Sequence, residues 1–369
     1  MKAIKGENTC NNNKEKTHEK PVWLLTTIIV VLFLGSGSLL GQATFQFTIQ
    51  TWGTYTTYDH YDWNADSSAL DLTETTTQLG VGIRRARLRG KMTKGKASAF
   101  VQVDGPSGDL LDAQIDYSLT DNLKLRMGRF VGAGSQAGGN TSHTAIDFAE
   151  RSIVGRLWAS SVGRSDYRTY GTSLIGKYNN FNYQVMAHNG DGHLNIKPYG
   201  TKSSKSDEDT GAMPQLDFAV STKLGNGLST GLHYGLPNEN RINVSSATGF
   251  LYLDPKDYSS GKLRGKLDFT RVVNHEGESD VVSLGYALKG FYKLHDKMEV
   301  GAGYEQWDPN TDVDTDSFGN IVVGVNYSPN PEHWKDTLFK LVATFKTSEV
   351  DNEPLDPLMV HLVWQVYMH

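Results

Sequence analysis

The chain of 369 residues has a single cysteine and one long apolar run, and both scarcities exclude whole classes of protein. One cysteine cannot pair within the chain, which excludes a disulfide scaffold. A helical protein with several membrane crossings is excluded because each crossing needs about 18 or more consecutive apolar residues. The formal net charge of −5 provides no basic surplus for nucleic acid. An aromatic content of 10% argues against intrinsic disorder.

The mean hydropathy of −0.43 is that of a water-soluble protein, with one class excepted. In a membrane β-barrel the apolar residues occupy every second position, so they cancel in any average over the chain. Composition therefore leaves two possibilities, a soluble protein and a barrel, and the pattern along the chain has to decide between them.

The long apolar run belongs to a predicted signal peptide over residues 1–43. Five lysines precede an apolar core at 22–34, and small residues lead to Gly41-Gln42-Ala43. This order is typical of a secretory leader, with cleavage expected after Ala43, and an uncleaved anchor helix is the alternative. Cleavage would remove Cys10 and leave a domain over 44–369. Without the five Lys and three Glu of the leader, that domain carries 31 cationic and 38 acidic residues.

The rest of the chain alternates between apolar and polar residues, which is the period of a β-strand. In the last segment, Val360, Leu362 and Trp364 share one face, and His361 and Gln365 share the other. The pattern predicts sixteen strands, of which the tenth is weak, so that fourteen is the other even number to consider. Their expected ranges are 45–57, 78–92, 96–105, 110–118, 123–131, 168–178, 181–189, 212–224, 228–236, 246–254, 262–273, 280–294, 297–308, 318–328, 336–348 and 357–368.

Connection lengths and aromatic positions distinguish a barrel from a soluble sandwich, which also alternates. Tight turns mostly follow the even-numbered segments and longer loops the odd-numbered ones, as in outer-membrane barrels. Tyr117, Tyr178 and Trp364 lie at the ends of apolar faces, where a lipid–water boundary would be. We therefore predict an all-β, transmembrane antiparallel barrel in outer-membrane lipid, with both termini on the periplasmic side and a water-filled lumen.

The segment 83–91 carries the strongest local charge pattern. Alternation puts Arg85, Arg87, Arg89 and Lys91 on one face, here called the cation ladder, and Arg84 on the opposite face. Each cation would cost a few kcal/mol near the midplane of the lipid, so the ladder must line the lumen. It either attracts anions or braces the wall by pairing with carboxylates on the next two strands, namely Asp104, Asp112 and Asp116.

The connection 132–167 is long and has apolar residues of its own, which predicts that it folds back onto another part of the protein. Its flexible glycines precede a mixed apolar and charged stretch, 146–158, which predicts a short helix capped by Ser142 or Thr144. Folded inward, the connection would narrow the pore; an outward surface loop is the alternative. The expected constriction residues are Glu150, Arg151, Arg156, Arg164 and Arg168, and the expected lining cations of the preceding strand are Lys124 and Arg126.

Three strand segments and two later motifs together resemble the phosphate-selective porin O and P family over about 78–195. In chain order they are Arg84-Arg85-Ala86-Arg87-Leu88, Leu110-Leu111-Asp112-Ala113-Gln114-Ile115-Asp116-Tyr117, Leu125-Arg126-Met127-Gly128-Arg129-Phe130, Phe148-Ala149-Glu150-Arg151-Ser152 and His188-Asn189-Gly190-Asp191-Gly192. The resemblance implies a sixteen-stranded, homotrimeric outer-membrane channel with an inward third loop. Barrels of this kind typically end in Phe, whereas this sequence ends in Met368-His369, in the strand that the barrel-assembly machinery would read.

The sequence thus predicts a porin for passive diffusion of small anionic solutes such as phosphate. No catalytic residues, cofactor or metal are expected, because the histidines are scattered and no nucleophile signature is present. The Asp312, Asp314 and Asp316 run lacks the later Gly and Glu of an EF-hand. Two alternatives stay open: a non-transporting structural or adhesive barrel, and a barrel hydrolase.

Overall fold

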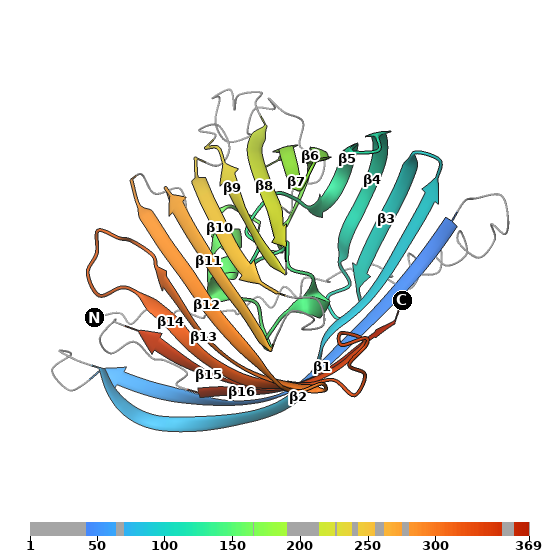
Figure 1. Ribbon diagram of the computed structural model, residues 1–369. Coiled ribbons are helices and arrows are strands. Elements are labelled where there is room, and N and C mark those ends of the chain that lie inside the picture. The colour runs from blue at the N-terminus through green and yellow to red at the C-terminus, as the bar shows by residue number, and fades with distance from the viewer. Residues whose placement is uncertain are drawn as a thin grey trace, which may run out of the picture. The chain divides into compact units, whose positions relative to one another are not determined.

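A computed structural model describes residues 42–63, 70–164, 166–189, 214–225, 227–237, 243–254, 262–274, 280–348 and 358–368 (Figure 1). Within these residues sixteen antiparallel strands form one closed barrel, in which β16 pairs with β1. The predicted leader lies outside the described residues up to Gly41. The strands are β1 (Gln42–Trp63), β2 (Leu70–Lys94), β3 (Ala97–Asp104), β4 (Leu110–Thr120), β5 (Leu123–Val131), β6 (Arg168–Tyr178), β7 (Phe181–His188), β8 (Gln215–Gly225), β9 (Leu228–Gly235), β10 (Ser245–Leu253), β11 (Leu263–Val273), β12 (Val282–His295), β13 (Met298–Asp308), β14 (Phe318–Tyr327), β15 (Thr337–Ser348) and β16 (Leu358–Met368).

The predicted all-β barrel and its number of strands are confirmed, and the largest difference is the length of the first hairpin. Pairing between β1 and β2 continues from Thr57↔Thr77 to Trp63↔Leu70, where the sequence predicted a loop. The run from Thr73 to Thr77 is polar at every position, so it has no apolar period to recognise. Threonine nevertheless favours a strand because it is β-branched.

The two faces of each strand differ as the alternation predicted. Leu79 and Val81 of β2 are 82% and 89% exposed on the outer surface, and Trp364 of β16 is also exposed there. On the inner face of β16, His361 and Gln365 are buried. Exposed apolar side chains around the outside and buried polar ones inside are the arrangement of a barrel in lipid.

A β-bulge in β2 changes the direction of one predicted side chain. Gln50 pairs with Arg85 and Thr51 pairs with Ile83, so Arg84 is an extra residue in the ladder of hydrogen bonds. The alternation reverses there. The expectation that Arg84 lies on the lipid side is wrong: its guanidinium lies 5.0 Å from the ring of Trp52 and contacts the inserted connection.

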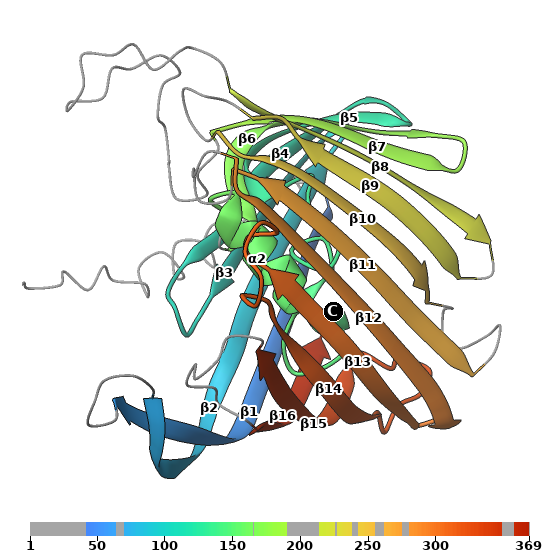
Figure 2. The same cartoon turned by 90° about the vertical axis from the view of Figure 1, so that its left-hand side faces the viewer.

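The connection 132–167 lies inside the barrel, where it forms a 3-10 helix, η1 (His143–Ala145), and an α-helix, α2 (Ile153–Ser161) (Figure 2). The helix starts later than predicted, and neither Ser142 nor Thr144 caps it. Its N-cap residue, Ser152, makes no side-chain capping bond. The backbone N–H of Ile153 instead donates to Oε2 of Glu305 on β13, 2.9 Å away. A capping carboxylate 152 residues further along the chain leaves no local signal in the sequence.

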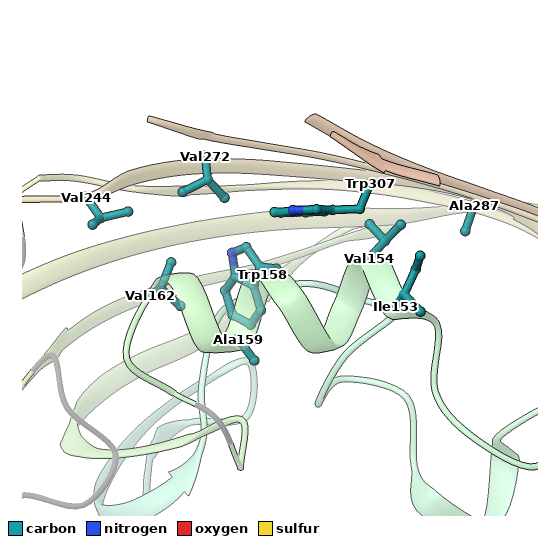
Figure 3. Close-up of a cluster of buried hydrophobic side chains, with 9 residues drawn as sticks. All are labelled: Ile153, Val154, Trp158, Ala159, Val162, Val244, Val272, Ala287 and Trp307. Carbon is teal, nitrogen blue, oxygen red and sulfur yellow. The ribbon is translucent and has the colours of Figure 1, made fainter. Parts of the chain in front are cut away.

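One face of α2 packs against the inner wall (Figure 3). Ile153, Val154 and Trp158 form a buried cluster with wall residues that include Val272 and Trp307. Trp158 also donates from Nε1 to the hydroxyl of Ser246 at 3.2 Å. Because a buried apolar side chain contributes about 1.5–3 kcal/mol, this cluster is a substantial anchor for the helix. Neither helix in the described part of the chain has the length and hydropathy that crossing a bilayer would need.

Candidate functional site: an arginine-lined cavity in the barrel

A cavity of about 700 Å³ lies between strands β2–β6 and the inserted connection. Eight arginines and three carboxylates line it, so its lining is strongly cationic although the chain as a whole is acidic. The arginines are Arg84, Arg85, Arg87, Arg89, Arg126, Arg151, Arg156 and Arg168, and the carboxylates belong to Asp112, Glu150 and Asp166.

The members of the cation ladder have different partners. Arg87 donates to Asp104 at 2.9 Å, as the bracing hypothesis expects. Arg89 contacts the neutral side chains of Gln102 at 2.5 Å and His143 at 2.9 Å. Burial, together with the nearby charges of Arg89 and Arg87, lowers the pKa of His143 well below its usual range, so this imidazole is neutral. The positive charge of Arg89 is therefore not cancelled by its two neighbours.

The other two members of the cation ladder, Arg85 and Lys91, lie at its two ends. Arg85 is buried and donates to Gln50 at 2.7 Å, with Glu150 3.6 Å away. Lys91 is exposed and pairs across the sheet with Phe100, which lines the cavity. Directly paired residues point to the same side of a sheet, so Lys91 faces the lumen.

The two predicted cations of β5 share one carboxylate. Lys124 lies 3.0 Å from Asp116, and Arg126 approaches the other oxygen of the same carboxylate at 2.7 Å. Arg126 lines the cavity, whereas Lys124 lies nearer the tight turn that joins β4 to β5. This cluster holds two cations against one anion and keeps a positive excess.

Two of the loop residues have their charged groups held by the protein. Glu150 accepts from Arg84 at 2.6 Å. Burial alone would raise the pKa of Glu150, but Arg84 and Arg85 hold it below its usual range. Arg151 donates to the backbone carbonyls of Gly138 and Thr141 at 2.9 and 2.6 Å and lies over the ring of Tyr167.

The other three arginines that the sequence placed at the constriction differ in how far they reach the cavity. Arg156 is exposed, and among the described residues it has no ion-pair partner. Arg168 lines the cavity but is held by both oxygens of Asp112, at 3.0 and 2.9 Å. Arg164 lies elsewhere: it is 2% exposed, pairs with Asp217 at 2.7 Å and is not part of the cavity lining.

Sequence reasoning missed the residues that fasten the connection to the far wall. Arg264 and Lys266 of β11 hold the carboxylate of Asp147, the lysine at 3.0 Å. Lys340 of β15 donates to the carbonyls of Ile146 and Phe148. The charges of Lys266 and Arg264 outweigh burial and keep the pKa of Asp147 below its usual range. Over a hundred residues separate these partners, so neither periodicity nor spacing could pair them.

Solved structures with the same architecture include proteins described as a porin and as an outer-membrane channel. The anion-selective porin of Comamonas acidovorans is 16% identical, with a TM-score of 0.59 over 89% of this chain and 99% of its own. The outer-membrane channel DcaP of Acinetobacter baumannii is 14% identical, with a TM-score of 0.60 over 90% and 99%. OmpF of Salmonella typhi, solved with daunomycin, is 9% identical, with a TM-score of 0.58 over 89% and 98%.

The chain has the fold of the outer-membrane porins. At these identities the likeness concerns the fold alone. No protein-family model matches the sequence, and no curated protein sequence matches it. The resemblance to phosphate-selective porins O and P stays a prediction.

Proposed function

We propose that this protein is an outer-membrane channel for the passive diffusion of small solutes and that it prefers anions such as phosphate. The observation that carries the proposal is the excess of arginine over carboxylate in the lining of the main cavity. Charges of one sign in a water-filled passage raise the local concentration of ions of the opposite sign. Rings or rows of Arg and Lys favour anions for the same reason.

The position of the inserted connection supports the same proposal. In the barrel it brings Arg151 and Arg156 to the side of the lumen that already carries Arg87 and Arg89. Its own carboxylates, Asp147, Glu150 and Asp166, are held by cations and do not form an opposing acidic wall. The loop therefore brings two arginines to the passage, while its carboxylates there are paired with arginines of the barrel wall.

We extend the proposal to the surroundings of the barrel. The exposed apolar face fits outer-membrane lipid, with the long connections on the cell surface. A homotrimer, recognition of β16 by the barrel-assembly machinery and cleavage of a leader near Ala43 are parts of the same proposal. The fold shared with the anion-selective porin of Comamonas acidovorans supports it at the level of architecture.

Reversal potentials in planar bilayers under a KCl gradient test the proposal. We expect chloride to be preferred, and we expect Arg89→Gln to reduce that preference by about twofold, because one charge in a wet lumen acts with roughly 0.5 kcal/mol. The matched control is Arg271→Gln, which removes an exposed cation from the outer face of β11 and leaves the preference unchanged. Preference for potassium would overturn the anion proposal, and absence of conductance would favour a structural barrel.

A further inference from the structure

A second cavity, of about 450 Å³, lies on the other side of the loop segment 150–156. It is bounded by β13–β16, and the same three loop residues, Glu150, Arg151 and Arg156, also line the main cavity. Phe318 and Lys346 place it toward the end of the barrel that carries the long connections. A solute that reaches the main cavity from that end therefore passes beside this side chamber.

The side chamber differs from the main cavity in its chemistry. Apolar side chains form much of its wall: Phe148, Val322 and Val342 are buried in one cluster behind it, and Phe318 and Met359 are partly exposed at its surface. The main cavity is lined by eight arginines and by fewer apolar side chains, such as Phe100 and Leu111. The side chamber thus offers an anion a larger apolar surface beside a cation than the main cavity does.

The charges of the side chamber leave a cationic end. Glu150 is paired with Arg84 at 2.6 Å, and Glu305 is paired with Lys289 at 3.1 Å while it caps α2. Arg156 is exposed, and no carboxylate of the described residues lies within ion-pair distance of it, although its charge helps to lower the pKa of Glu150. A carboxylate that enters the chamber meets the exposed Arg156 and the less exposed Lys346 as cations of the lining.

We propose that this side chamber is a binding subsite for organic monocarboxylates with a compact apolar body, such as an aromatic ring, and this inference rests on the proposed anion channel. The carboxylate pairs with Arg156, and the apolar body lies against Phe318 and Met359. Burial of apolar area is favourable in proportion to the area removed from water. An anion without such a body gains only the charge interaction and passes through the main cavity without being retained.

Concentration-dependent block of the chloride current tests the subsite, with sodium benzoate and sodium acetate as probes of equal charge. We expect benzoate to reach half-block at about a tenfold lower concentration than acetate, the difference that burial of roughly two methylene groups gives. Met359→Gln, which keeps length and removes apolar character, should bring the two half-block concentrations together. Arg156→Gln should weaken the block by benzoate severalfold, and Arg271→Gln should leave the tenfold ratio unchanged.

The results that would contradict this inference differ from the result that would contradict the function on which it rests. Equal block by benzoate and acetate in a channel that still prefers chloride would overturn the subsite and leave the anion channel intact. Retention of the tenfold ratio in Met359→Gln, or of the full benzoate block in Arg156→Gln, would also overturn it. Preference for potassium in the reversal-potential measurement would overturn the proposed function itself.

Discussion

The two walls of the barrel carry the same kinds of charged residue but use them differently. On the wall of β2–β5, Arg89 and Arg126 line the main cavity. On the wall of β11–β15, Lys266 and Lys340 are buried against the inserted connection and bind Asp147 and two backbone carbonyls. The loop therefore brings a carboxylate and backbone carbonyls to these two lysines, whereas it brings only the neutral imidazole of His143 to Arg89.

Loss of the Asp147 carboxylate should have the largest effect, because this group fastens the loop to the wall of β11–β15. Asp147→Asn removes the carboxylate that Arg264 and Lys266 share, although Arg264 keeps Glu299 at 2.9 Å. Loss of one partner of a buried ion pair costs about 3–5 kcal/mol. We expect a lower midpoint of thermal unfolding in detergent and a noisier open-channel current, since the middle of the loop is then held to the far wall by fewer contacts, such as those of Lys340.

The matched control is Asp296→Asn, which changes the same residue type in the exposed turn between β12 and β13. Its pairing with Lys293 is at the surface, where such pairs contribute little. We expect no measurable change in midpoint or current noise. If Asp147→Asn behaved like this control, the loop would be held by contacts other than the ion cluster on β11.

A substitution on the cation-rich wall of β2–β5 should have a smaller effect, which is an increase in the chloride preference. Asp104 neutralises Arg87 at 2.9 Å, so Asp104→Asn should free a cation toward the lumen. We expect the chloride preference to rise by about twofold, the effect of one partly screened charge. The double variant Arg87→Gln, Asp104→Asn should return the permeability ratio to its original value. An unchanged ratio in the single variant would show that Arg87 is a brace and does not contribute to the field in the passage.

Particular residues show how far the sequence could predict this structure. Sixteen strands followed from alternation because lipid on one side and water on the other act on every strand alike. The bulge at Arg84 could not be predicted, since it follows from pairing between β1 and β2. Of the three carboxylates expected to pair with the cation ladder, Asp104 pairs with Arg87, because the two strands are neighbours in sequence and in the sheet. The other two pair elsewhere: Asp112 with Arg168, and Asp116 with Lys124 and Arg126.

No comparable closeness in sequence marks the contacts that the inserted connection 132–167 makes with the wall. The side chain of Asp147 meets Lys266 across 119 residues, and α2 is capped by Glu305 across 152. Nothing in the spacing of residues along the chain distinguishes these two carboxylates from the many on the surface. Their roles depend on where the loop lies in the closed barrel, which is a property of the whole fold.

The smallest predicted effect is a pH dependence of the thermal midpoint. It tests whether the charged carboxylate of Asp147 is what holds the loop to the far wall. Lys266 and Arg264 hold the pKa of Asp147 below its ordinary value of 3.8. A carboxylate with a lowered pKa stabilises the folded state fully above its unfolded value, and this stabilisation is lost as the pH falls through the lower folded value. The difference in thermal midpoint between wild type and Asp147→Asn should therefore be constant from pH 8 to about pH 5 and should shrink only below about pH 4. A difference that grew as the pH fell from 7 to 5 would mean that Asp147 takes up a proton in the folded barrel, which the two cations beside it oppose.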